Sequence, residues 1–129
     1  MSITTRIPVT TNKAPAAIGP YSQAMATGTL LFTSGVIPLD PLTGTIPEGS
    51  IEDHSHLVFR SLAAIAEAAG TSLDQAVKVT VFLTDISHFK RVNAVYAHYF
   101  SEPYPARSAV QVAALPLGAA IEVEAVIAL

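Results

Sequence analysis

The spacing of apolar residues switches between two periods along this chain of 129 residues, and this switching narrows the choice of fold. Near the middle, apolar side chains recur at intervals of three, four and seven residues: Ile51, Val58, Leu62, Ile65 and Ala69. At the C-terminus they occupy every second position: Ile121, Val123, Ala125, Ile127 and Leu129. The first pattern predicts an α-helix with one apolar stripe, and the second predicts a β-strand with one apolar face.

The predicted helix has a clear start and end in the sequence. Ser50 precedes the apolar stripe, and its hydroxyl can accept a hydrogen bond from a free backbone N–H of the first turn. Asp53 stands three residues further on, which makes a variant of the capping box. Gly70 follows an alanine-rich segment and suits the conformation that often ends a helix. We expect this helix over residues 50–70.

The same periodicities predict four further elements in the rest of the chain. A second helix is expected over residues 87–100, with apolar side chains at helical spacing: Phe89, Val92, Tyr96, Tyr99 and Phe100. Alternation predicts strands over 77–83, 107–113 and 121–129. In the first of these the apolar members of one face are Val77, Val79, Val81 and Leu83.

The N-terminal part of the chain is shaped by glycine and proline. Tyr21 to Ser34 is expected to form two short strands that break at residues 27–29, a Thr-Gly-Thr segment. Prolines and glycines make segments 13–20 and 38–49 irregular.

These elements alternate in the order β-β-α-β-α-β-β and predict one α+β domain over residues 1–129. We expect a mixed β-sheet with both helices packed on one face. The opposite face would carry side chains that are too apolar for contact with water: Thr80, Phe82, Ser108, Val110, Val112 and Val126. Association through that face would cover it, so the sequence favours a homo-oligomer.

The charge content supports association and excludes several functions. Seven basic and ten acidic side chains make up 13% of the chain, about half of the ~25% usual for a soluble domain. The formal net charge of −3 argues against nucleic acid and anionic membranes as partners. No apolar run is long enough to span a membrane, and the N-terminus has no signal-peptide pattern, so we expect a cytoplasmic protein.

The residue types and motifs of the chain also argue against several kinds of catalysis and metal binding. It has no cysteine, which excludes a disulfide framework and a thiol nucleophile. His54 and His56 would point about 200° apart on a helix, so they cannot share a metal ion, and we expect no metal. No glycine-rich phosphate loop, HExxH or GxSxG pattern occurs.

Three polar features remain as candidates for a site. Arg107 is the first residue of a predicted strand and follows Pro105-Ala106. It either binds a carboxylate through two parallel hydrogen bonds or forms a surface ion pair. Glu122 lies, with Glu124, on the polar face of an apolar strand; it is either a base with a raised pKa or part of a solvated edge. Asn93 shares a helix face with aromatic residues, where it either serves a site or bonds a nearby loop.

Six segments of the chain, taken in order, give it a strong resemblance to a known family. They are APAAIGPYSQA at 14–24, LLFTSGVIPLDPLTG at 30–44, AEAAG at 66–70, VKVTVFLTDISHF at 77–89, VNAVYAHYF at 92–100 and PARSAVQVAALPLGAAIEVEAVIA at 105–128. Together they resemble the reactive intermediate deaminases, the RidA/YjgF family, from Ala14 to Ile127. The last segment is the most specific.

The resemblance implies a chorismate-mutase-like fold of the bacillus type, assembled as a homotrimeric barrel with active sites between subunits. It also implies hydrolysis of small carboxylate-bearing enamines and imines, such as 2-aminoacrylate, to 2-keto acids and ammonia, without a cofactor. By position, Arg107 would bind the substrate carboxylate, Glu122 would activate the attacking water and Tyr21 would line the site. The pocket would be shaped by Ser34, Phe89, Asn93 and Ala109.

Two departures from the family pattern leave alternatives open. Ala109 stands where the family often has cysteine, which removes thiol modification but leaves backbone contacts to substrate. The segment 54–62, HSHLVFRSL, replaces one that usually carries polar amides. The diverged segment leaves room for a deaminase of a larger catabolic intermediate, such as an aminomuconate or a pyrimidine-derived aminoacrylate. A non-catalytic regulator that binds metabolites in the same cleft is a separate alternative.

Overall fold

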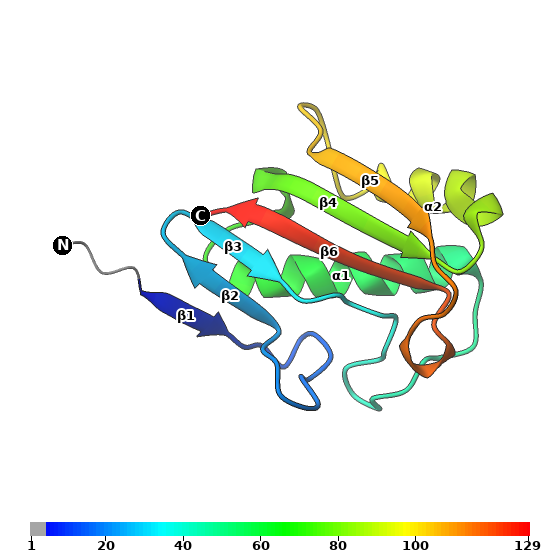
Figure 1. Cartoon of the computed structure of the whole chain (residues 1–129), viewed down its shortest axis with the longest axis horizontal. Helices are drawn as coiled ribbons and strands as arrows, with labels where there is room; N and C mark the ends of the chain where they lie inside the picture. Colours follow the sequence, from blue (N-terminus) through cyan, green and yellow to red (C-terminus); the bar gives the residue numbers. More distant parts are fainter. Residues whose placement is uncertain (1–4) are drawn as a thin grey trace.

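Two α-helices lie on one face of a six-stranded mixed sheet in the computed structural model, which describes residues 5–129 (Figure 1). The strands are β1 (Arg6–Val9), β2 (Ala24–Thr27), β3 (Leu30–Thr33), β4 (Ala76–Leu83), β5 (Ala106–Gln111) and β6 (Ile121–Ala128). Their order in the sheet is β1-β2-β3-β6-β4-β5, and only β4 and β5 run parallel. The predicted α+β architecture with both helices on one face is confirmed.

Helix α1 (Ile51–Ala68) begins and ends as its sequence predicts. The Asp53 N–H donates to Ser50 Oγ and the Ser50 N–H donates to Asp53 Oδ2, both at 3.1 Å, which completes a capping box. At the other end Gly70 adopts a φ of +83°, and the Thr71 N–H donates to the Ala66 carbonyl at 3.0 Å. This Schellman-type ending satisfies carbonyls of the last turn.

Helix α2 (Phe89–Tyr96) is shorter than the predicted span of 87–100. Residues 86–88 form a 3₁₀ turn instead, because the Asp85 carboxylate accepts from the Ser87 N–H at 2.9 Å and tightens the entry. At its C-terminal end, the N–H groups of His98 and Tyr99 donate to carbonyls three residues back, so the final turn is also 3₁₀-like. α2 connects β4 to β5, which is the kind of crossover that a parallel pair requires.

The predicted strands need correction in several places, one of which is that β5 ends at Gln111 and not at residue 113. β1 is an additional strand that the periodicity does not reveal; it pairs with β2. β2 begins at Ala24 rather than Tyr21, because the Gln23 side chain is bonded to the preceding loop, accepting from the Thr11 N–H at 2.7 Å. Val77 lies at a β-bulge, where the β4–β6 register shifts, and is 48% exposed, so it does not belong to the core face.

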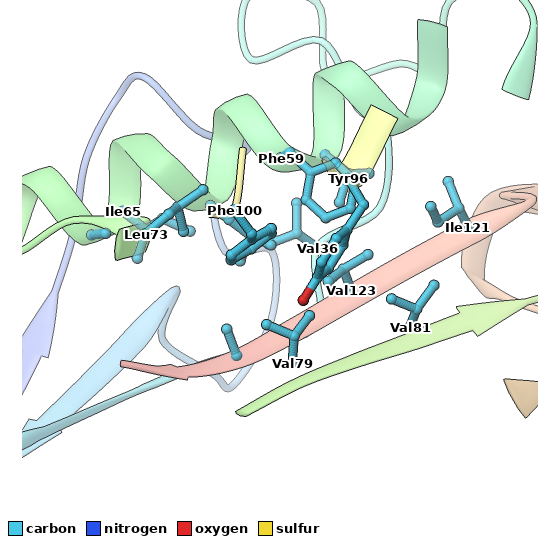
Figure 2. Packing of buried hydrophobic residues seen from close by; sticks show 14 of the residues in the cluster. Val36, Phe59, Ile65, Leu73, Val79, Val81, Tyr96, Phe100, Ile121 and Val123 are labelled. Atoms are coloured by element: carbon cyan, nitrogen blue, oxygen red, sulfur yellow. The ribbon is translucent and has the colours of Figure 1, made fainter. Parts of the chain in front are cut away.

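The core forms where β4 and β6 face α1. Its sheet side consists of residues that are at most 1% exposed: Val79, Val81, Leu83, Ile121, Val123 and Ile127. On the helix side, the Phe59 ring packs against the rings of Tyr96 and Phe100 at centroid distances of 5.7 and 5.9 Å (Figure 2). Outside the core, Arg91 of α2 donates to both carboxylate oxygens of Glu52 in α1, at 3.0 and 2.6 Å. The two helices are thereby fixed to each other and to the sheet.

The opposite face of the sheet is not covered by either helix. Phe32 on this face is 44% exposed and Val110 is 42% exposed, with Thr80, Phe82 and Val126 half-buried beside them. Apolar side chains on the uncovered face are thus confirmed, although Val112 lies beyond the end of β5. A second copy covering this face stays a prediction. Within residues 5–129, no helix combines the length and apolar character needed to cross a membrane.

The capping box of α1 yields a stability prediction. Ser50→Ala removes the side-chain acceptor of the Asp53 N–H and should lower the free energy of unfolding by about 1 kcal/mol. Ser72 is a matched control, because it stands at the start of a 3₁₀ turn without a side-chain capping bond, and Ser72→Ala should change stability by less than ~0.5 kcal/mol. Urea unfolding at one protein concentration measures both. Equal losses in the two variants would contradict the role of the capping box.

Candidate functional site

Arg107 lies on the edge strand β5 and is held by side chains of α2. Its Nη1 donates to Asn93 Oδ1 at 2.7 Å. Its guanidinium carbon lies 5.0 Å from the centroid of the Phe89 ring and 4.6 Å from that of Tyr96, which is cation–π distance. Within residues 5–129 no carboxylate lies at ion-pair distance from Arg107, so the surface ion-pair alternative is wrong for this part of the chain. The guanidinium is oriented, and it has donors left for a ligand.

Cavities open on two sides of this arginine. One, of about 410 Å³, is lined by Asn93, Tyr96 and Arg107, with Tyr104 and Pro105 from the segment before β5. The other, of about 400 Å³, is lined by Ile86, Phe89, Arg107 and Ala109. Four of the predicted site residues, Phe89, Asn93, Arg107 and Ala109, therefore share one region. We call it the arginine half-site.

Glu122 lies in a separate and larger cavity of about 610 Å³. Tyr21 and Ser34 line this cavity with it, so the remaining three predicted residues also come together. The Tyr21 hydroxyl accepts from the Ile18 N–H at 3.4 Å and keeps its own proton to donate, and Ser34 Oγ donates to the Ser22 carbonyl at 2.5 Å. We call this group the glutamate half-site.

The surroundings of Glu122 favour its protonated form. Burial raises the pKa of its carboxyl above the ordinary 4.5, and the negative charge of Glu124 raises the pKa further. Gly35 passes directly over the side chain: a Cβ at Gly35 would lie 2.7 Å from the carboxyl carbon of Glu122. The carboxyl end of Glu122 thus lies against the backbone at Gly35, and a larger residue there would require this flexible end to shift. A carboxyl with a raised pKa in an apolar cavity is suited to accept a proton.

The sheet places the two half-sites of one chain apart. Arg107 pairs with Val79, whose side chain faces the helices, whereas Glu122 pairs with Phe82 on the uncovered face. Side chains of paired residues point to the same side of a sheet, so those of Arg107 and Glu122 point to opposite sides. They are also separated by three residues along β4 and two strand spacings, or roughly 14 Å between backbones.

Several residues that line these half-sites were not predicted from the sequence as site residues, and three of them bear directly on the geometry. Tyr96 is 5% exposed and supports Arg107; burial raises the pKa of its hydroxyl, and the arginine's charge partly offsets this. Tyr96 lies three residues after Asn93 on the same helix face, and this spacing could have identified it as a site residue from the sequence. Gly35 and Leu117, which line the glutamate half-site, gave none, because their importance depends on contacts between distant segments.

Among residues 5–129, no group of three or more His, Asp or Glu side chains is placed so that it could hold a metal ion. His54 Nε2 lies 2.7 Å from the Pro47 carbonyl oxygen, and His56 Nδ1 lies 2.9 Å from the Tyr99 hydroxyl. The two side chains thus turn to different partners, as their spacing predicted. The His56 and His98 rings meet across the helices at 5.9 Å, a contact that the sequence did not predict.

The fold and the two half-sites define an α+β protein with an oriented arginine on one side of its sheet and a glutamate of raised pKa on the other. A family model described as endoribonuclease L-PSP matches residues 11–129. The chain belongs to this family, that of the reactive intermediate deaminases (RidA/YjgF) that its sequence resembles.

Known proteins similar to the chain come from distant organisms. It is 51% identical to "RutC family protein y4sK" of Sinorhizobium fredii, over 95% of this chain and 97% of that protein. It is 44% identical to the human 2-iminobutanoate/2-iminopropanoate deaminase, over 98% of this chain and 92% of that one. The crystal structure of Escherichia coli TdcF with bound serine superposes with a TM-score of 0.89 at 41% identity, covering 95% and 98% of the two chains.

The raised pKa of Glu122 predicts a pH-dependent stability difference. Ionised Glu122 costs stability in the folded protein above its folded pKa, and this cost disappears as the pH falls below about 4.5, where both states hold the proton. Glu122→Gln cannot ionise, so its melting temperature should exceed that of the wild type at pH 7, and the gap should close toward pH 4.

The measurement is thermal unfolding between pH 4 and pH 8 at one protein concentration. Glu102→Gln provides the matched control, because Glu102 is exposed and its substitution relieves no burial. A Glu122→Gln gain that is absent at pH 7, or equal at all pH values, would refute the assignment of a desolvated carboxyl.

Proposed function

We propose that this chain is an enamine/imine deaminase that hydrolyses 2-imino acids, including the imine tautomer of 2-aminoacrylate, to 2-keto acids and ammonia. The observation that carries the proposal is the pair of complementary half-sites: an oriented guanidinium that has no carboxylate partner among residues 5–129, and a carboxyl with a raised pKa. The names of relatives with 44% and 49% identity, a 2-iminobutanoate/2-iminopropanoate deaminase and a reactive intermediate deaminase, support the same chemistry.

Each half-site supplies one part of this reaction. Arg107 binds the substrate carboxylate through two parallel N–H···O bonds, while Asn93 and the aromatic rings hold the guanidinium in place. This fixes the C=N carbon in position for attack. The serine bound to TdcF, a small amino acid with a carboxylate, is a ligand of the same chemical class.

Glu122 activates the water. Its carboxylate takes a proton from the water as the oxygen bonds to the imine carbon and passes that proton to the nitrogen, which gives a tetrahedral amino alcohol. Glu122 then transfers the hydroxyl proton to the nitrogen, so that the keto group forms, the C–N bond breaks and ammonia leaves. Because an imine carbon is already electrophilic, orientation and one base are sufficient, and we propose that no cofactor takes part. Tyr21 lines the site with a free O–H donor that can bond the reacting nitrogen or the water.

One chain presents the two half-sites on opposite sides of its sheet, so we propose that each complete site joins Arg107 of one subunit to Glu122 of its neighbour. A homotrimer with a chorismate-mutase-like arrangement would do this while covering the apolar face that carries Phe32 and Val110. The substrate is then the only small-molecule partner. A net charge of −3 with seven basic residues gives no support to RNA as a substrate, despite the word endoribonuclease in the family description.

The direct test generates 2-aminoacrylate from serine with a pyridoxal-phosphate lyase and follows loss of the imine absorbance. The protein should accelerate keto-acid formation, and Arg107→Ala should lower kcat/KM by about 100-fold, because a charge-assisted bond to the carboxylate is lost. Arg60→Ala is the matched control, since Arg60 is an exposed arginine of α1 outside both half-sites. A wild type that adds nothing to the solvent rate, or an Arg107→Ala variant as fast as Arg60→Ala, would show the proposal to be wrong.

A further inference from the structure

Leu117 adopts a backbone conformation that does not suit leucine. Its φ and ψ are 57° and 24°, in the left-handed region that residues with a Cβ rarely occupy, and Gly118 follows with a φ of +72°. The side chain is also 73% exposed, so burial within the chain does not compensate for the strain. Glycine or asparagine would be favoured at this position on backbone grounds. Neither the backbone conformation nor burial within the chain accounts for a leucine at this position.

This side chain lines the cavity of Glu122. Leu117 and Pro116 approach it from one segment, and Ile18, which is 78% exposed, approaches from another. Val36 and Leu39 continue the apolar wall behind them and are buried. Two unusually exposed aliphatic side chains thus border the same cavity.

Besides Glu122 and the Tyr21 hydroxyl, few polar groups of the cavity are available to a ligand. Gln23 is committed to the protein: its amide accepts from the Thr11 N–H and donates to the carbonyls of Thr11 and Pro15. Ser34 donates its proton to the Ser22 carbonyl. A polar substrate side chain placed here would lose bonds to water and find few in return.

The cavity also exceeds the smallest substrate. A three-carbon imino acid has six non-hydrogen atoms, and even at ~30 Å³ per atom, the volume of a water in the liquid, it would need under ~200 Å³. The cavity measures about 610 Å³. It has room for a longer side chain beside the reacting carbon.

We propose that Leu117 and Ile18 form a specificity wall that selects 2-imino acids with aliphatic side chains the size of that of leucine. This inference rests on the proposed deaminase function and deepens it. The exposed aliphatic surface of the wall is covered when such a side chain enters, and the imine carbon remains beside Glu122. In this proposal, leucine is kept at position 117 despite its unfavourable backbone conformation because its side chain determines which substrate binds.

Two variants that suit the left-handed conformation test the wall without disturbing the turn. Leu117→Gly removes the side chain, and Leu117→Asn replaces it with a polar one of the same number of non-hydrogen atoms. Leu42→Asn is the matched control, because Leu42 is 93% exposed and lies outside the cavity. The substrates are the imines that an L-amino acid oxidase forms from leucine and from asparagine, which have equal numbers of non-hydrogen atoms, and from alanine.

We expect wild type to prefer the leucine-derived over the asparagine-derived imine, and both Leu117 variants to lower that ratio of kcat/KM by about 10-fold or more. The Leu42 variant should keep the wild-type ratio. Melting temperature and mass by light scattering check that the Leu117 variants fold and assemble.

The results that would contradict the specificity wall differ from those that would contradict the proposed function. If the Leu117 variants lose activity on both imines equally, together with assembly, Leu117 is an interface residue and the specificity wall is wrong. An unchanged ratio also overturns it. In both of these cases, the proposed function stands if wild type accelerates hydrolysis of the alanine-derived imine. If wild type accelerates hydrolysis of none of the three imines, the proposed function itself fails.

Discussion

Alternation along β6 sends neighbouring side chains to opposite sides of the sheet, and the core and the candidate site both depend on it. Ile121 and Val123 are fully buried toward the helices, so Glu122 between them must point to the other face. The same rule, carried across β4 by the strand register, turns Arg107 toward α2. The pairing that builds the core therefore also separates the two charged groups that we propose act together on one small substrate.

The separation of the two half-sites and the low charge content can both be explained by association of subunits. A chain with 13% charged residues leaves an apolar sheet face uncovered, with Phe32 and Val110 more than 40% exposed. Association of copies would remove that face from water and, in the arrangement we propose, would bring the arginine half-site of one subunit to the glutamate half-site of the next. Hydrophobic burial and assembly of the site would then be a single event, and a lone subunit would lack a complete site.

Sequence patterns predicted what local chemistry determines: the capping box at Ser50, the ending at Gly70 and the two faces of β6. The sequence patterns gave incomplete or wrong predictions where contacts with residues distant in the sequence determine the local structure. β1 forms only because β2 pairs with it, Val77 leaves the core face because β4 bulges against β6, and α2 is shorter because Asp85 caps an earlier turn. The residues of both half-sites were identified mainly through the family resemblance. Their division into two groups, the close approach of Gly35 to Glu122 and the strained Leu117 required three-dimensional contacts.

The central claim, that one site takes Arg107 and Glu122 from different subunits, is tested most directly by subunit mixing. Arg107→Ala and Glu122→Gln, each expected to be strongly impaired alone, are unfolded together in equal amounts and refolded, and imine hydrolysis is compared with that of wild type treated identically. With random assembly, a site needs an intact arginine from one subunit and an intact glutamate from its neighbour, so about one quarter (½ × ½) of the sites should be restored. If the mixture stays as inactive as its two components, although mass spectrometry detects mixed oligomers, both residues act within one chain and the account is contradicted.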